Sequence, residues 1–349
     1  MPFIYLKKAD GDVIINTVKW SNVGSDPKQE RNCKNMGRKV AIIGAGSVGA
    51  SIAFTLAVSG NAAEIVLIDI NEQKAFGEAM DIRQGAPFIS PINIYAGGYD
   101  DAKDSDIVIL TSGIARRPGQ SRLDLAQTNV DITKSIIPKI TKVAPNAVYI
   151  IVSNPVDILT YVFCKCSGLP ERQIIGTGAL LDTARLRSRL AENFSISMQN
   201  VHANVFGEHG DSSFVPWSIA TISGTPIDIY AQSKGLQVDG CGFNHEEIEE
   251  YVRKSGSTII TAKGATNYAI ALTTNNICSS IFRGIDTALS VSTMMNGEYG
   301  INDVCLSILS IVGRGGVNGK IISPLTDEEI IKLHNSADRL KEVIAQLKI

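Results

Sequence analysis

The sequence predicts an α/β fold in which a doubly wound parallel sheet is followed by a mixed α/β domain. From residue 39 onward, continuous apolar segments of strand length alternate with helical segments, which is typical of a parallel sheet covered on both faces. The chain has 31 glycines but only 6% aromatic residues, a composition that favours tight turns and aliphatic strands. Its 349 residues are enough for two domains.

The predicted elements follow one another in regular order. We expect strands at 39–44, 64–70, 106–113 and 147–154, joined by helices over 48–59, 72–84 and 125–142. After about residue 154 the pattern changes to longer helices and mixed strands. Thr326, followed by Glu329, is a capping box that opens a C-terminal amphipathic helix. We expect its apolar face to carry Ile330, Ile331, Leu340, Val343 and Leu347.

Composition and charge exclude several classes of protein. With 44% hydrophobic and 19% charged residues, the chain is not disordered throughout. A net charge of −2 argues against nucleic-acid or membrane-surface binding, and no apolar run reaches the roughly 18 residues that span a bilayer. The six cysteines form no Cys-x-x-Cys pair, which predicts reduced core thiols in a cytoplasmic protein, and no Cys/His set predicts a metal site.

A glycine-rich turn carries the first functional signal. Residues 44–49, GAGSVG, fit G-x-G-x-x-G between a strand and a helix, and Asp69 follows 20 residues later at a strand end. In such a Rossmann turn, Gly44 permits the tight bend, Gly46 lets a pyrophosphate approach the backbone, and Gly49 lets helix and strand pack closely. Asp69 would accept hydrogen bonds from the adenosine ribose and repel a 2′-phosphate, which favours NAD over NADP. A glycine-rich turn without a ligand is the alternative.

These signals divide the chain into three segments. Residues 1–36 mix acids and bases without a secretory pattern, and we expect a dispensable or disordered extension, or a mis-assigned start. Residues 37–180 are the predicted NAD-binding Rossmann domain. Residues 181–349 are the predicted substrate domain, which carries most of the candidate catalytic side chains.

One of the four histidines lies in a polar loop suited to proton transfer. His209 is flanked by polar residues and glycine in GEHGDS, and imidazole titrates near neutral pH. On a predicted helix at 181–190, Asp182 and Arg185 share a face at i, i+3 spacing. A carboxylate beside an imidazole fixes its tautomer and raises its pKa, and a neighbouring arginine can seat a substrate carboxylate. A structural histidine and a surface ion pair are the alternatives.

At this point the sequence resembles the lactate/malate dehydrogenase family from residue 39 to the C-terminus. The resemblance rests on GAGSVG, LIDI, SRLDL, VSNPVDILTY, LDTARLR and GEHGDS, which follow one another in the family's order. It implies an NAD-dependent reaction that interconverts a small 2-oxo acid and an L-2-hydroxy acid. It also implies a homotetramer built from dimers.

The resemblance further implies roles for individual side chains. His209 is the proton donor and acceptor, Asp182 orients it, and Arg185 binds the substrate carboxylate. Arg122 closes in on a mobile loop and polarises the substrate carbonyl, while Asn154 contacts both substrate and cofactor. Loop closure would exclude water that screens these charges. The implied NAD contacts beyond the three glycines are Val48, Asp69, Lys74, Tyr99, Gly113, Ser135, Val152 and Asn154.

The substrate remains open between two hydroxy acids. Alignment on Gly113 and Arg122 puts Arg116 at the specificity position of the family. The resemblance implies arginine at this position in malate enzymes and glutamine in lactate enzymes. Oxaloacetate has a second carboxylate that needs a charged partner, whereas an unpaired arginine enclosed over the methyl group of pyruvate is costly. The whole-chain pattern nevertheless favours L-lactate dehydrogenase over malate dehydrogenase. The residues that resemble lactate enzymes are Glu208, Leu123, Ile270 and Thr266, the last also a candidate substrate contact.

Two further residues point to regulation. Arg187 and His202 resemble the pair that binds fructose 1,6-bisphosphate in bacterial lactate dehydrogenases. The alternatives are a solvated helix face for Arg187 and a buried polar strand residue for His202. The rival function is a dinucleotide-binding sensor, which would need the glycine turn but not the four catalytic side chains together. An NAD-dependent glycosidase would share the turn but would need a metal-binding Cys/His set.

Overall fold

The computed structural model describes residues 4–9, 12–17, 37–114, 121–240 and 242–349, which form two compact units, Met1–Gly37 and Arg38–Ile349. The first unit contains an antiparallel pair, β1 (Ile4–Ala9) and β2 (Asp12–Thr17), with Ile4 opposite Thr17. This pair differs from the dispensable or disordered extension predicted for residues 1–36. The signal in the sequence is the dipeptide Asp10-Gly11 between Ile4-Tyr5 and the β-branched run Val13-Ile14-Ile15.

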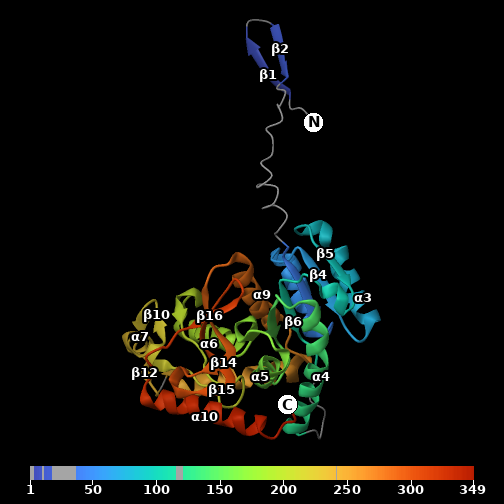
Figure 1. The fold of residues 1–349 in the computed structure, drawn as a ribbon. Helices are drawn as coiled ribbons and strands as arrows, with labels where there is room; N and C mark the ends of the chain where they lie inside the picture. The colour runs from blue at the N-terminus through green and yellow to red at the C-terminus, as the bar shows by residue number, and fades with distance from the viewer. Residues whose placement is uncertain (1–3, 10–11, 18–36, 115–120, 241) are drawn as a thin grey trace. The chain divides into compact units, whose positions relative to one another are not determined.

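The second unit is built on one sheet, nine strands of which lie in the described chain (Figure 1). Six strands are parallel, in the order β5-β4-β3-β6-β7-β8, which is the doubly wound order of dinucleotide-binding sheets. The winding reverses between β3 and β6, and a crevice is expected at the carboxyl ends of these two strands. The strands are β3 (Lys39–Ile43), β4 (Glu64–Ile68), β5 (Asn93–Ala96), β6 (Ile107–Leu110), β7 (Val148–Ile151) and β8 (Ile174–Gly176).

The sheet continues past the predicted domain boundary. β14 (Thr287–Asn296) pairs antiparallel with β8 through Ser292 and Gly176, and β15 (Asn302–Gly313) and β16 (Gly316–Lys320) follow. The predicted boundary at 180/181 falls at the start of α6 (Leu180–Phe194). The two predicted domains therefore share a single sheet, because a C-terminal strand completes the edge that β8 would otherwise expose.

Helices cover both faces of this sheet (Figure 1). Ala41 and Ile43 of β3 lie on the face of the sheet that α4 (Arg122–Val143), α5 (Val156–Ser167) and α10 (Asp327–Ile344) cover. The alternate residues Val40 and Ile42 face α2 (Ser47–Ser59), α3 (Glu72–Gln84) and α9 (Tyr268–Arg283). The predicted fold class is confirmed, and the central strands β3, β4, β6 and β7 are apolar except for Lys39 and Glu64, because both of their faces are buried.

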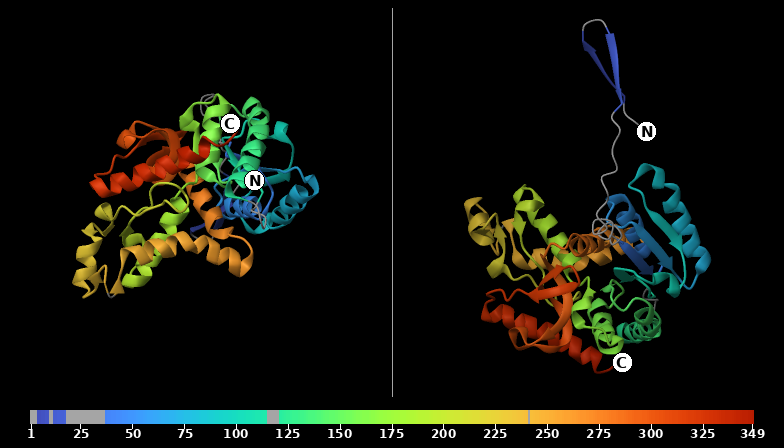
Figure 2. Two further views of the ribbon diagram at one scale, coloured as in Figure 1. Left: turned by 90° about the horizontal axis from the view of Figure 1, so that it is seen from below. Right: turned by 45° about the horizontal axis from the view of Figure 1, so that its top comes forward.

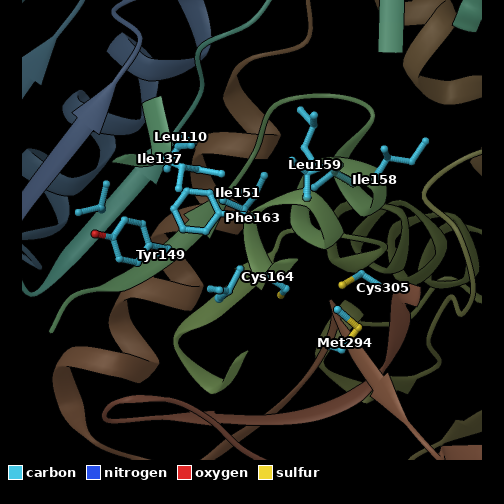
Figure 3. Close-up of a cluster of buried hydrophobic side chains, with 14 of the residues drawn as sticks. Leu110, Ile137, Tyr149, Ile151, Ile158, Leu159, Phe163, Cys164, Met294 and Cys305 are labelled. Atoms are coloured by element: carbon cyan, nitrogen blue, oxygen red, sulfur yellow. The ribbon is translucent and has the colours of Figure 1, made fainter. Parts of the chain in front are cut away.

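The core on the α4/α5 side contains a fully buried aromatic pair. Tyr149 and Phe163 pack with ring centroids 4.8 Å apart, and Cys164 and Cys305 lie further along the same cluster (Figure 3). The prediction of reduced core thiols is confirmed for these two cysteines and for Cys278, which are buried and free. It is wrong for Cys166, which is exposed, while Cys33 and Cys241 lie outside the described residues.

A third apolar cluster forms the lobe that faces the carboxyl ends of the parallel strands. It packs α6 against α7 (Ile227–Ser233) and α8 (His245–Lys263). The remaining short strands of this lobe are β9 (Val201–His202), β10 (Thr221–Ile222), β11 (Thr225–Pro226), β12 (Gln237–Val238) and β13 (Gly242–Phe243).

The C-terminal helix α10 begins at the predicted capping box, in which Thr326 and Glu329 bond reciprocally. Its predicted apolar face is partly wrong, because Ile331 is 59% exposed while Leu333 is buried. The C-terminus lies beside α4, where the Lys348 amide donates to the Gln127 side chain (Figure 2). Among the described residues, no helix is both long and apolar enough to cross a membrane.

Candidate active site

The glycine turn between β3 and α2 has the geometry that the motif predicts. Gly44 has φ of +106°, and a Cβ there would lie 2.7 Å from Thr111 Oγ1. A Cβ on Gly49 would lie 1.9 Å from the Gly44 carbonyl oxygen, so both positions require glycine. Gly46 is different, because a Cβ there would have no neighbour within 4 Å. A side chain is therefore excluded at Gly44 and Gly49, whereas the open space at Gly46 lets another group approach the backbone.

Two features beside this turn suit a bound dinucleotide. No side chain caps the first turn of α2, which leaves its amide groups available to an anion. Asp69 follows β4, and its carboxylate accepts from the Ala45 amide at 2.6 Å and from the Asn71 amide at 2.8 Å. These bonds fix the carboxylate next to the glycine turn. Lys74 lies in the first turn of α3 with an exposed side chain.

A cavity of about 560 Å³ opens between this turn and the lobe of α6 and α8. It brings together side chains from both predicted domains, which are far apart in the sequence. The predicted site residues that line it are Val48, Gly113, Val152, Asn154, Asp182, Arg185, His209 and Thr266.

The centre of the cavity wall is a charge cluster around Asp182, on the first turn of α6. His209 Nδ1 lies 2.5 Å from Asp182 Oδ2, and Arg185 Nη1 donates to Asp182 Oδ1 at 2.7 Å. Asp182 is 5% exposed. One buried carboxylate thus orients the imidazole with one oxygen and the guanidinium with the other. Nε2 of His209 is then the ring nitrogen available for proton transfer.

The electrostatics of this cluster favour an imidazolium. The Asp182 carboxylate raises the pKa of His209 to about 9, against the opposing effect of burial. Burial would raise the pKa of Asp182, but the charges of His209 and Arg185 outweigh it and lower that pKa. His209 therefore retains its proton at neutral pH, in a position where it can be donated.

Asn154 follows β7 and links the cavity to α4. Its carbonyl oxygen accepts from Asn129 Nδ2 at 2.8 Å, and Asn129 Oδ1 accepts from the Ile114 amide at 2.9 Å. The Asn154–Pro155 peptide is cis. Asn129 thereby ties the end of β7 to the start of the predicted lid loop.

Arg122, at the first residue of α4, lies in a neighbouring hollow rather than in the main cavity. Its Nη1 is 2.6 Å from Asp211 Oδ2, and both side chains are largely exposed. The hydrogen bond to Asp211 raises the pKa of Arg122. Arg116 lies outside the described residues.

Two implied NAD contacts lie away from the cavity. Tyr99 opens the short helix η2 (Tyr99–Ala102), with Lys139 Nζ 5.6 Å from its ring centroid. Ser135 is exposed on α4, and its hydroxyl donates to the Ile132 carbonyl. Their contacts with NAD stay predictions.

The two residues with the predicted regulatory role lie near each other, where α6 meets the chain after β9. Arg187 on α6 donates to the Ala203 carbonyl at 2.9 Å and to the Asn204 side chain at 3.1 Å. His202 is exposed on β9, next to Ala203. Burial lowers the pKa of Arg187.

One wall of the cavity consists of residues that were not predicted from the sequence. Arg253, Ser257 and Ile260 of α8 line it, together with Gly256, which lies beside the Arg185 guanidinium. Arg253 is held by Glu249 at 3.0 Å. The spacing of 253, 256, 257 and 260 places these residues on one helical face, which is the signal that could have found them.

Two family models match the chain. Residues 38–176 match the lactate/malate dehydrogenase, NAD binding domain. Residues 179–348 match the lactate/malate dehydrogenase, alpha/beta C-terminal domain. Together the matches span almost the whole second unit of the structure.

Curated relatives and solved structures are similar over most of the chain. An L-lactate dehydrogenase of Thermoanaerobacterium saccharolyticum is 48% identical over 312 residues, which is 89% of this chain and 99% of the relative. An L-lactate dehydrogenase of Clostridium perfringens is 44% identical over 311 residues, with 89% and 98% covered. The minor L-lactate dehydrogenase from Enterococcus mundtii matches with a TM-score of 0.86 at 36% identity, over 90% of this chain and 100% of that one.

Proposed function

The chain belongs to the lactate/malate dehydrogenase family of NAD-dependent oxidoreductases, which act on a CH–OH group. From this premise we propose that it is an L-lactate dehydrogenase, which converts pyruvate, NADH and a proton to L-lactate and NAD. The observation that carries the proposal is the cluster in which Asp182 holds both His209 and Arg185 in the wall of the cavity.

His209 is the proposed proton donor in reduction and acceptor in oxidation. Its pKa of about 9 keeps the ring protonated at neutral pH, so the acid form is ready when a 2-oxo acid enters. Asp182 holds Nδ1 and stabilises the cation, which directs the exchangeable proton at Nε2 toward the cavity. In the opposite direction the ring must first lose a proton, so oxidation of the hydroxy acid is expected to rise with pH.

The arginines have distinct proposed tasks. Arg185 is fixed by Asp182 through Nη1, so its remaining N–H groups can bind the substrate carboxylate. Arg122 would leave Asp211 and enter the main cavity, where its charge stabilises the negative charge that develops on the carbonyl oxygen. Asn154 and Thr266 line the same cavity and are the proposed polar contacts to substrate.

The residues present fit NAD. The open space in front of Gly46, the uncapped amides of α2 and the carboxylate of Asp69 suit a pyrophosphate and a ribose diol. When bound, NADH supplies the hydride. Val48, Gly113 and Val152 line the same cavity as His209, where they would shield the reacting end from water.

Pyruvate rather than oxaloacetate is the proposed substrate. The named relatives at 44–48% identity are L-lactate dehydrogenases, whereas Arg116 in the sequence favours oxaloacetate. The test is kcat/KM for each 2-oxo acid with NADH. A higher kcat/KM for pyruvate supports the proposal. A strong preference for oxaloacetate would contradict it and make malate dehydrogenase the function.

Replacing Arg116 by glutamine sharpens this test. If the residue faces the substrate, Arg116→Gln lowers kcat/KM for oxaloacetate by tenfold or more, because a buried charge pair is lost. Pyruvate should be affected less. An unchanged ratio would show that Arg116 points away from the substrate.

A fructose 1,6-bisphosphate site at Arg187 and His202 is part of the proposal. Arg187 donates to the carbonyl of Ala203, directly after β9, and the exposed His202 precedes Ala203, so both side chains can offer N–H groups to a phosphate. The compound should lower KM for pyruvate, and His202→Ala should remove the response. A response that persists in the variant would reject this site.

A homotetramer in the cytoplasm completes the proposal. Phe54 and Val58 of α2 and Tyr268 and Leu272 of α9 are exposed apolar side chains on neighbouring helices, which suits a subunit interface. Sedimentation should give a tetramer, and Leu272→Glu should shift it to smaller species. A monomeric wild type would contradict this part.

A further inference from the structure

A second buried carboxyl group lies beneath the loop that carries His209. Asp157 is the second residue of α5 and is 2% exposed. Its Oδ2 accepts a hydrogen bond from the backbone amide of His209 at 2.7 Å, while its Oδ1 bonds to no described residue. A buried carboxyl with one oxygen unpaired is costly, so it calls for an explanation.

The position of Asp157 in the chain connects it to the rest of the site. It follows Asn154 by three residues, and Asn154 lines the cavity. The first turn of α5 also favours a negative charge, because the amide groups of a helix begin there. The same short segment thus provides one polar residue to the cavity and one carboxyl group to the loop behind it.

From this arrangement we propose that Asp157 is a positioning residue for proton transfer. It fixes the backbone from which the His209 imidazole projects, and it places a second negative charge beside that ring. The proposal rests on the proposed role of His209. Asp157 does not touch the substrate, and it acts only through His209.

The groups around Asp157 define its charge. Burial raises the pKa of Asp157 to about 6, while Ser292 on β14 and the His209 amide and charge oppose that rise. The Ser292 hydroxyl faces the carboxyl without forming a well-aligned hydrogen bond. Glu208 of the loop and Cys305 of β15 also face it, and the charge of Glu208 raises the pKa of Asp157 further. Asp157 is therefore mostly ionised at pH 7 to 8, where its charge supports the His209 cation.

Substitutions can separate the two functions of Asp157, which are to accept a hydrogen bond from the His209 amide and to carry a negative charge. Asp157→Asn keeps an oxygen that accepts from the His209 amide but removes the charge. The imidazolium is then less stable, so the pH at which pyruvate reduction declines on the basic side should fall by about 0.5–1. Asp157→Ala also leaves the buried amide unpaired and should lower kcat about tenfold or more, and the asparagine should rescue most of that loss.

The control removes a carboxylate elsewhere in the same sheet. Glu64 at the start of β4 is partly buried and bonds to Tyr95, at the amino ends of the strands. Glu64→Gln should leave the pH profile unchanged. NADH affinity should be unchanged in the Asp157 variants as well, which shows that they are folded.

A measurement on the unmodified protein guards against variants that fail to fold. The chain has four histidines, so 15N-histidine labelling gives few amide signals, and His209→Asn identifies that of His209. This amide should shift with a midpoint near pH 6 as Asp157 titrates. Absence of this shift, or a wild-type pH profile in Asp157→Asn, overturns the proposal. If His209→Asn retained turnover, the proposed function itself would fail. If His209→Asn is inactive but Asp157→Asn keeps the wild-type pH profile, only the role of Asp157 is rejected.

Discussion

The glycine turn at 44–49 and the cluster around His209 lie in one site, but their shapes have different physical origins. The turn takes its shape from the backbone, since side chains at Gly44 and Gly49 would collide with neighbouring atoms. The cluster takes its shape from buried charge, since Asp182 fixes both His209 and Arg185. Addition of an atom should therefore disturb the glycine turn, whereas removal of a charge should disturb the cluster around His209.

Removal of the imidazole is expected to have the largest effect. His209→Asn should lower kcat for pyruvate reduction by about 10²–10⁴-fold, because the general acid is lost. NADH affinity, followed by fluorescence titration, should stay within about twofold, because the glycine turn is untouched. Retained turnover would separate His209 from the chemistry.

The glycine turn should respond to addition of a single carbon. Gly49→Ala puts a Cβ 1.9 Å from the Gly44 carbonyl oxygen, so the free energy of unfolding should fall by about 1–3 kcal/mol. The matched control, Gly46→Ala, meets no atom within 4 Å and should lose less than about 1 kcal/mol. It should nevertheless weaken NADH binding, because its methyl group enters the open space of the turn. Equal thermal stability of the two variants would contradict the steric account.

The smallest expected effect concerns the pair of Arg122 and Asp211. This pair is exposed, so it contributes about 0–1 kcal/mol, and Arg122 must leave it to reach the substrate. Asp211→Asn should therefore lower KM for pyruvate by up to about threefold. Glu250→Gln, which breaks an exposed ion pair with Lys254 in the same hollow, is the control and should leave KM unchanged. A higher KM in Asp211→Asn would mean that Asp211 helps to place Arg122.

The same contrast explains how much could be predicted from the sequence. The glycine turn is local, so Gly44, Gly46, Gly49 and the following Asp69 identify it from spacing alone. The strands β3, β4, β6 and β7 were also predictable, because burial on both faces makes them apolar except for Lys39 and Glu64. The short strands β5 and β8 were not predicted.

Features that depend on distant contacts were not predictable in this way. The pairing of Ser292 with Gly176, which extends the sheet, joins strands more than a hundred residues apart. The α8 wall with Arg253 and Ser257 depends on how that helix lies against α6. The prediction that Ile331 lies on the buried face of α10 is wrong for the same reason. Helical spacing identifies an apolar stripe, but the rotation of the helix about its own axis, which decides the buried residues, depends on the elements it packs against.

The pH dependence of kcat/KM for pyruvate reduction, measured in the wild type and in Asp182→Asn, tests the central claim most directly. Because the carboxylate of Asp182 raises the pKa of His209 to about 9, the wild-type rate should hold below that pH and decline above it. In Asp182→Asn the decline should move toward the ordinary imidazole value of about 6.5. The same basic inflection in both proteins would contradict the claim that Asp182 keeps His209 protonated for catalysis.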